Sequence, residues 1–238
     1  FRRVLFRSIY YAFTNGQGQF TIRNLSEFFT DPNTMGTLVY SFAIAIVTTV
    51  VCLLLAYPTA YLLATSNLKA KAVVIMIFVM PMWINFSLRI TALKEILNVI
   101  ERNLARYPFT NAVIGMTYDF LPFMILPIYN SLTKIDPNVI NAAYDLGADS
   151  LQVLVLVTIP LSVSGIISGI TMVFVPALTT FVISSLLGGS KILLIGNIIE
   201  QEFTQANNWY LGSGLSIILM IFIVINMVIS MISEQKEE

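Results

Sequence analysis

The sequence NAAYDLGADSLQVLVLVTIP, residues Asn141–Pro160, is a polar segment that lies between two long apolar stretches. Asp136 and Pro137 precede it and form a typical helix start. An Asp side chain accepts hydrogen bonds from free backbone N–H groups, and a proline at the first helical position sacrifices no hydrogen bond. Gly147 is placed to end the helix, because glycine readily adopts the left-handed conformation that follows many helices. We therefore predict a short helix that begins at Pro137 and ends before Gly147.

One face of this short helix is small and apolar. Its positions at helical spacing are Val139, Ala142, Ala143 and Leu146, bordered by the polar residues Asn141, Tyr144 and Asp145. So short a helix is marginal in water and needs a partner surface. Small side chains allow a helix to approach a groove closely. The segment therefore predicts docking on another protein.

The same segment resembles the cytoplasmic loop of permease subunits of binding-protein-dependent ABC importers. That loop has the pattern E-A-A, three residues, G, nine residues, I, one residue, L-P. Here the corresponding residues are Asn141, Ala142, Ala143, Gly147, Val157, Ile159 and Pro160. Asn141 departs from the usual Glu, and Val157 and Ile159 are conservative changes. The resemblance implies that an ATPase-coupling loop is formed by Asn141, Ala142, Ala143, Asp145, Leu146, Gly147 and Pro160.

Composition places the whole chain in a membrane. Hydrophobic residues make up 57% and charged residues 11% of the sequence, with a mean hydropathy of +0.82, whereas about a quarter of an average soluble protein is charged. The formal net charge is zero and there is no histidine, which argues against nucleic-acid binding, histidine-based catalysis and a histidine-rich metal centre. The single cysteine, Cys52, cannot form an internal disulfide.

Apolar runs predict an all-α, polytopic transmembrane helix bundle, and the resemblance implies that it carries a cytoplasmic coupling helix. We expect five complete spans: residues Leu38–Ala64, Ala72–Ile90, Asn111–Leu132, the part of Leu151–Leu187 that follows a break at Pro160, and Leu211–Ile232. Lys94–Phe109 has the mixed pattern of an interfacial helix. Ile9–Gly36 and Lys191–Tyr210 carry turn signals and are expected to be loops.

The first eight residues, FRRVLFRS, resemble the in-frame translation of a sequencing-adaptor primer. We expect residues 1–8 to be non-native and residues 9–238 to be an N-terminally truncated permease domain, whose full-length form has six spans. Lysine and arginine counts do not fix the orientation of these spans. The resemblance makes the loop at Asn141–Pro160 cytoplasmic and the protein a multi-pass component of the bacterial cytoplasmic membrane.

Further stretches are similar to the spermidine/putrescine branch of these permeases: Leu53–Ala64, Pro81–Arg89, Tyr118–Leu132 and Phe181–Phe203. The resemblance implies polyamine import, with ferric iron or thiamine as alternative cargoes. It also implies three protein partners, which are a cytosolic ATPase dimer, a second homologous permease and a soluble extracytoplasmic binding protein. The chain has no phosphate-binding loop of the G-x4-G-K-[ST] type, so we expect no cofactor and ATP bound by the partner.

Candidate residues for the cargo path are Trp83, Asn85, Asp119, Glu200 and Glu202. Acids attract polycations, aromatic faces bind ammonium groups, and ionisable groups within membranes are usually functional. Each residue also has a plain structural alternative: an interfacial anchor for Trp83, a helix-end acid for Asp119, and solvated loop charges for Glu200 and Glu202. An intramembrane enzyme would need a catalytic group that the sequence does not supply, and a passive scaffold would not explain the loop spacing.

Overall fold

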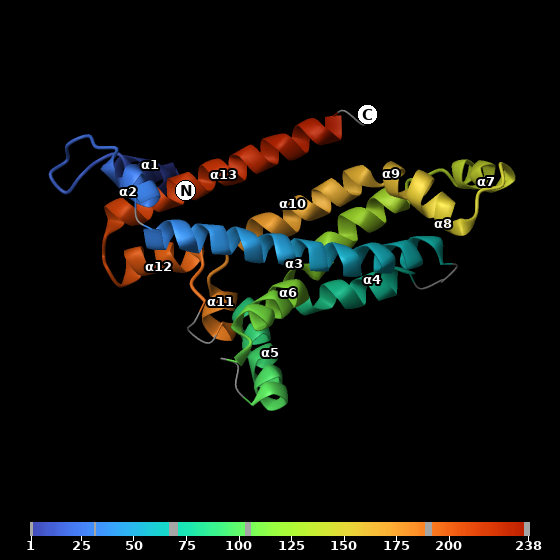
Figure 1. Cartoon of the computed structure of the whole chain (residues 1–238), viewed down its shortest axis with the longest axis horizontal. Helices are drawn as coiled ribbons and strands as arrows, with labels where there is room; N and C mark the ends of the chain where they lie inside the picture. The colour runs from blue at the N-terminus through green and yellow to red at the C-terminus, as the bar shows by residue number, and fades with distance from the viewer. Residues whose placement is uncertain (1, 31, 67–70, 103–105, 189–191, 236–238) are drawn as a thin grey trace.

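Three long helices lie side by side and form the centre of the molecule (Figure 1). The computed structural model describes every residue except 1, 31, 67–70, 103–105, 189–191 and 236–238. The central helices are α3 (Pro32–Thr65), α6 (Pro108–Leu132) and α10 (Val163–Thr179). Within the described part, the only β-type pairing is an isolated bridge between Thr14 and Phe20. The predicted all-α class is confirmed.

Apolar residues fill the space between these three helices. Fully buried side chains on them include Ile44, Cys52, Met116, Met124, Ile125 and Val173. Glycine allows the closest approach: a Cβ added to Gly165 of α10 would lie 2.7 Å from the carbonyl oxygen of Pro127 on α6. The outer surface of α3 is also apolar, with Leu54 and Leu62 largely exposed. A helix that is apolar on both faces suits a core on one side and lipid or another membrane helix on the other.

Among the described residues, three helices are long and apolar enough to cross a membrane: α3, α6 and α13 (Trp209–Gln235). Two bent pairs raise the number of candidate spans to five. One pair joins Ser150–Leu161 to Val163–Thr179 with a bend of 66°. The other pair occupies the region of the second predicted span. If each bent pair is counted as one span, the number is the five that the apolar runs predict, although the fourth then includes the approach helix before Pro160.

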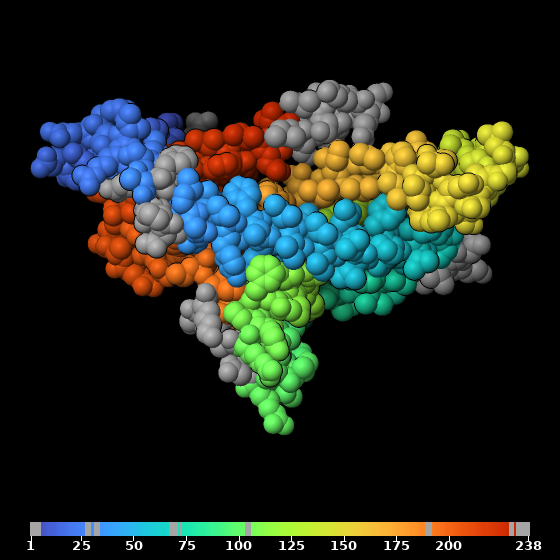
Figure 2. Space-filling model, viewed as in Figure 1, coloured from blue at the N-terminus to red at the C-terminus, as the bar shows by residue number. Residues whose placement is uncertain are grey.

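The second predicted span, Ala72–Ile90, is wrong as a single helix. The structure has α4 (Lys71–Val79), a 3₁₀ turn (Met80–Trp83) and α5 (Phe86–Glu101). Helix α5 is bent by 97° from the preceding helical segment Val73–Trp83. Asn85 explains the break, because its side chain accepts hydrogen bonds from the backbone N–H groups of Ser87 (3.0 Å) and Leu88 (3.5 Å) and so starts a new helix. Helix α5 projects from the side of the bundle (Figures 1 and 2).

Both predicted loops contain helices. The region Ile9–Gly36 holds the end of α1 (Arg2–Ala12), all of α2 (Arg23–Thr30) and the start of α3. The region predicted as a loop from Lys191, a residue outside the described part, contains α12 (Ile195–Thr204), which follows α11 (Val182–Leu187). The turn signals at Gly16 and Gly18 are confirmed between α1 and α2, but Gly196 lies inside α12. Helices α1 and α12 gain stability by packing against α13.

Candidate functional site

The predicted docking helix exists as α7 (Pro137–Asp145), at one end of the molecule (Figure 1). Asp136 has an extended backbone, and its side chain accepts a hydrogen bond from the N–H of Asn138 at 2.9 Å. Proline occupies the first turn, where its missing N–H costs nothing. The helix start predicted at Asp136 and Pro137 is confirmed.

Gly147 ends the helix with a left-handed backbone, φ +88°. Its N–H donates to the carbonyl of Tyr144 at 2.9 Å, and the N–H of Ala148 donates to Ala143 at 3.1 Å. These bonds satisfy carbonyls that a helix end leaves free. A left-handed residue costs little only when it is glycine. The predicted role of Gly147 is confirmed.

No residue of α7 is buried. Leu146, which follows the helix, is 90% exposed, and Val139 is 44% exposed. Asn141, Ala142 and Asp145 are also exposed, whereas Ala143 is half-buried. The predicted apolar stripe is therefore available to a partner. Figure 2 shows α7 and α8 (Ser150–Val153) projecting beyond the ends of the long helices.

A bent, largely helical connection joins α7 to α10. Asp149 caps α8 by a reciprocal pair of hydrogen bonds with Gln152. A π-helical segment, Leu154–Thr158, and a short helix, α9 (Ile159–Leu161), follow. The chain bends at Ser162, two residues after the break predicted at Pro160. The Ser162 hydroxyl lies 3.1 Å from the hydroxyl of Tyr57, which ties the bend to α3.

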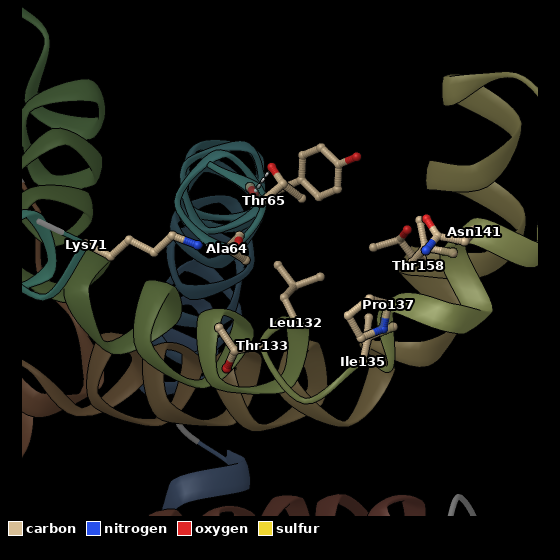
Figure 3. A pocket seen from close by; sticks show the side chains of 11 residues that line it. Ala64, Thr65, Lys71, Leu132, Thr133, Ile135, Pro137, Asn141 and Thr158 are labelled. Carbon is tan, nitrogen blue, oxygen red and sulfur yellow. Dashed lines mark hydrogen bonds between the residues drawn. The ribbon is translucent and has the colours of Figure 1, made fainter. Parts of the chain in front are cut away.

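Asn141 lines a cavity of about 670 Å³ between α7 and the nearby ends of α3 and α6 (Figure 3). Lys71 lies on the opposite side, and its Nζ donates to the carbonyl oxygen of Ala64 at 2.8 Å. Thr65, Thr133 and Thr158 contribute hydroxyl groups, and Leu132 and Ile135 contribute apolar wall. Asn141, at the position of the usual Glu, therefore lines a cavity that the positively charged Lys71 also lines.

Asp119 is the sequence-predicted acid that lies deepest in the protein. It is 4% exposed and forms an ion pair with Arg89 of α5. Arg89 also donates from Nη1 to the carbonyl oxygen of Pro81 at 2.9 Å. Its guanidinium lies 6.0 Å from the ring centre of Tyr118. Sequence reasoning did not select Arg89, although an acid inside a membrane usually pairs with an oppositely charged group.

Trp83 and Asn85 lie on the turn between α4 and α5. Trp83 is 74% exposed, and Asn85 caps α5. Arg89, one turn after Asn85, links this turn to Asp119. The structure therefore brings this part of the predicted path close to Asp119 through a residue outside the predicted set.

Glu200 and Glu202 lie apart from that group, on α12, which packs against α13 and α3. Glu200 lines a largely apolar cavity of about 410 Å³ with residues of α10, α12 and α13, and accepts a hydrogen bond from Thr204 Oγ1 at 3.1 Å. Glu202 is half-buried. The five predicted path residues thus form two separate groups.

A buried polar cluster around Asn197 fixes α12 in place. Asn197 accepts hydrogen bonds from the hydroxyl of Ser184 (2.6 Å) and the N–H of Leu194 (3.0 Å), and donates to the carbonyl of Phe181 (3.1 Å). Ser41 of α3 accepts from the N–H of Ile195 at 2.8 Å. Sequence reasoning missed this cluster, because nothing in a lone Asn within a presumed loop indicates burial.

The exposed capped helix, the bent connection and the apolar spans match a known family. A family model described as "Binding-protein-dependent transport system inner membrane component" matches residues 41–235. The chain belongs to this family. It is an inner-membrane permease subunit of an ABC importer, a transport component rather than an enzyme. Family membership implies an ATPase and a substrate-binding protein as partners.

Curated relatives cover most of the permease. It is 37% identical over 217 residues to the spermidine/putrescine transport system permease protein PotB of Escherichia coli, with 85% of this chain and 78% of that protein covered. It is 34% identical over 232 residues to PotB of Haemophilus influenzae, with 92% and 79% covered. A PotB homolog of Mycoplasma genitalium is 37% identical over 174 residues, with 69% and 60% covered.

Solved structures share the permease fold. A chain of the MetNI methionine ABC transporter, crystallised in an inward-facing conformation, superposes with a TM-score of 0.66 over 87% of this chain and 99% of that chain. The sequence identity is 18%, so this likeness supports the arrangement of helices and nothing finer.

Proposed function

We propose that this chain is a permease subunit of an importer for the linear polyamines spermidine and putrescine. The observation that carries the proposal is 37% identity to a spermidine/putrescine permease over 85% of the chain. Buried Asp119 and half-buried Glu200 and Glu202 are compatible with a polycationic cargo, because carboxylates offset part of the hydration that each ammonium group loses.

The importer that we propose contains four kinds of subunit. The chain pairs with a second homologous permease, receives cargo from a soluble extracytoplasmic binding protein, and is driven by a dimer of cytosolic ATPases that bind the ATP. Helix α7 is the segment that docks on an ATPase, with contacts from Asn141, Ala142, Ala143, Asp145, Leu146 and Gly147. Its capped start, its exposed apolar face and its position at the end of the bundle support this role.

Energy transfer follows from the geometry of the connection. A rigid helix seated in an ATPase groove moves as a body when nucleotide closes the ATPase dimer. Gly147 and the bend after Pro160 are the points at which the connection to α10 can change angle. Because α10 packs along α6 and α3, a displacement of α7 reaches the membrane-spanning core.

Uptake by the complete importer tests the proposal. Proteoliposomes containing this chain, its second permease, its ATPase and its binding protein are given radiolabelled spermidine, putrescine, thiamine or ferric iron. We expect ATP-dependent uptake of the two polyamines, with each competing against the other. Uptake of thiamine or iron without polyamine uptake would overturn the cargo assignment and leave the family unaffected. A matched preparation without the binding protein controls for leakage.

A further inference from the structure

A polar groove runs between α6 and α10 on the side of the chain away from the buried core. Its volume is about 660 Å³. The polar residues that line it are Asn130, Ser131, Lys134, Ser164 and Ser168. Asn130 and Lys134 are exposed, and the three serines are half-buried. The groove is separate from the cavity beside α7 and from Glu200.

Close helix packing forms the floor of this groove. An added Cβ on Gly165 would lie 2.5 Å from the Cβ of Ser131, so α6 and α10 touch along this line. The hydroxyls of Ser131 and Ser164 lie 3.4 Å apart across the contact. Met172, which is 52% exposed, lines the groove further along α10. The open side therefore faces out of the chain, toward whatever adjoins this face in the membrane.

Lipid is a poor neighbour for such a surface. A single hydroxyl in a membrane helix satisfies itself by bonding a carbonyl one turn earlier, as Thr59 of α3 does with Leu55 at 2.7 Å. The groove gathers an amide, three hydroxyls and an ammonium group from two helices at one place, whatever local bonds each of them makes. Hydrocarbon cannot hydrogen-bond to these groups, so polar surface of this kind lines a water-filled space or contacts protein.

The chemistry of the lining suits a cation that passes through and does not stay. Hydroxyl and amide oxygens accept hydrogen bonds from ammonium groups. Among the described residues that line the groove there is no carboxylate, and Lys134 lies at the end of α6 nearest α7. A conduction path needs partners strong enough to replace hydration and weak enough to allow release. The neutral oxygens of Asn130 and the three serines replace part of the hydration of a linear polyamine. The ammonium group of Lys134 repels the polyamine and so favours its release.

We infer that this groove is the segment of the translocation path nearest the ATPase, and that Asn130, Ser131, Ser164 and Ser168 solvate the ammonium groups of the polyamine there. The inference rests on the proposed function. Asp119 lies 11 residues before Asn130 on the same helix, which is about three turns and about 16 Å. A polyamine that leaves the region of Asp119 would reach the groove along α6.

Thiol accessibility tests the inference in the complete importer. Ser164→Cys and Ser168→Cys are each made, with Thr59→Cys as the matched hydroxyl-to-thiol control on α3. A small, positively charged methanethiosulfonate reagent is added to inside-out vesicles. We expect both groove cysteines to react and Thr59→Cys to resist, because a translocation path admits water, whereas Thr59 lies between the exposed apolar residues Leu55 and Leu62 on the outer face of α3. Spermidine, given with binding protein and ATP, should slow the groove reactions several-fold. Unreactive cysteines, or reactions that spermidine does not slow, would overturn the inference.

Uptake supplies a second readout. Ser168→Leu should lower spermidine uptake about tenfold, because it removes a hydrogen bond to a charged group and fills the groove. Ser168→Thr keeps the hydroxyl and should retain uptake, as should Thr59→Leu. Binding-protein-stimulated ATP hydrolysis should persist in all three. If the unaltered importer takes up no spermidine, the proposed function fails and the inference fails with it. If it does, and Ser168→Leu imports normally, only the groove assignment fails.

Discussion

Arg89 of α5 and Asp119 of α6 form an ion pair that is almost entirely removed from solvent, with side-chain exposures of 9% and 4%. The pair joins the projecting helix α5 to the central bundle. In this pair Arg89 binds Asp119, the acid that the sequence assigned to the cargo path. A guanidinium at Asp119 resembles an ammonium cargo in charge, so the same carboxylate is suited to either partner.

Asp119→Asn should therefore destabilise the protein as well as reduce uptake. Removing one partner of a buried ion pair leaves the other charge uncompensated, at a cost of about 3–5 kcal/mol. We expect a lower apparent Tm in detergent for Asp119→Asn. The double variant Arg89→Gln with Asp119→Asn should regain most of that Tm, since neither charge remains.

Uptake by the double variant separates two roles of Asp119. If the carboxylate only holds α5, the double variant imports spermidine normally. If it also contacts cargo, uptake stays low although stability is restored. An unchanged Tm in the single Asp119→Asn variant would contradict the pairing on which this experiment depends.

Local signals predicted the coupling region well. Asp136, Pro137 and Gly147 determine a helix start and end through backbone hydrogen bonds that involve only nearby residues, so the sequence is sufficient to place them. The break at Asn85 was missed because the apolar run continues through it, and a cap within such a run looks like any polar residue in a span.

Long-range contacts were beyond sequence reasoning. The partner of Asp119 lies 30 residues earlier, and that of Ser41 lies 154 residues later. Apolar and polar patterning reports which residues are buried, but not which helix covers them. The groove between α6 and α10 was missed for this reason, because Asn130 and Ser168 come together only once both helices are packed.

Asn197→Ala should loosen the connection between α11 and α12. The substitution removes one hydrogen bond each from the hydroxyl of Ser184, the N–H of Leu194 and the carbonyl of Phe181. Ser184 still donates to the Phe181 carbonyl at 2.9 Å, so the N–H of Leu194 is the group left unsatisfied. A buried polar group left unsatisfied costs about 1–3 kcal/mol. We expect a lower apparent Tm and faster proteolysis near α12. Asn138→Ala, at an exposed site of α7, is the matched control and should leave Tm unchanged.

Gly147→Pro should abolish transport and leave membrane insertion intact. Proline fixes φ near −65° and removes the N–H that donates to Tyr144, whereas the native φ is +88°. Gly147→Ala is the milder form, and a left-handed alanine costs about 1 kcal/mol. Gly36→Ala on α3, where an added Cβ meets nothing within 4 Å, is the control. Uptake and co-purification of the ATPase are measured together.

Ala143→Trp tests the docking face separately. Ala143 is half-buried on α7, and a large side chain there would hold the helix away from the ATPase groove. We expect loss of ATPase co-purification with normal membrane levels of the permease. Normal ATP-coupled uptake by this variant would show that α7 does not dock through its alanine face.

Asn141→Glu, which introduces the residue usual in this loop, should be tolerated. Asn141 is exposed and lines the cavity that Lys71 also lines, so a carboxylate there would lie in water with a cation across the cavity (Figure 3). Neither burial nor a like charge within that lining opposes it.

Asn141→Trp places bulk beside the docking face and should lower uptake strongly. A neutral side chain makes contacts that salt screens little, whereas exposed ionic contacts weaken as ionic strength rises. Uptake by the Glu variant should therefore fall more steeply with salt than uptake by the unaltered importer. Complete loss of uptake in the Glu variant at low salt would show that the ATPase surface facing Asn141 has itself changed to exclude a carboxylate.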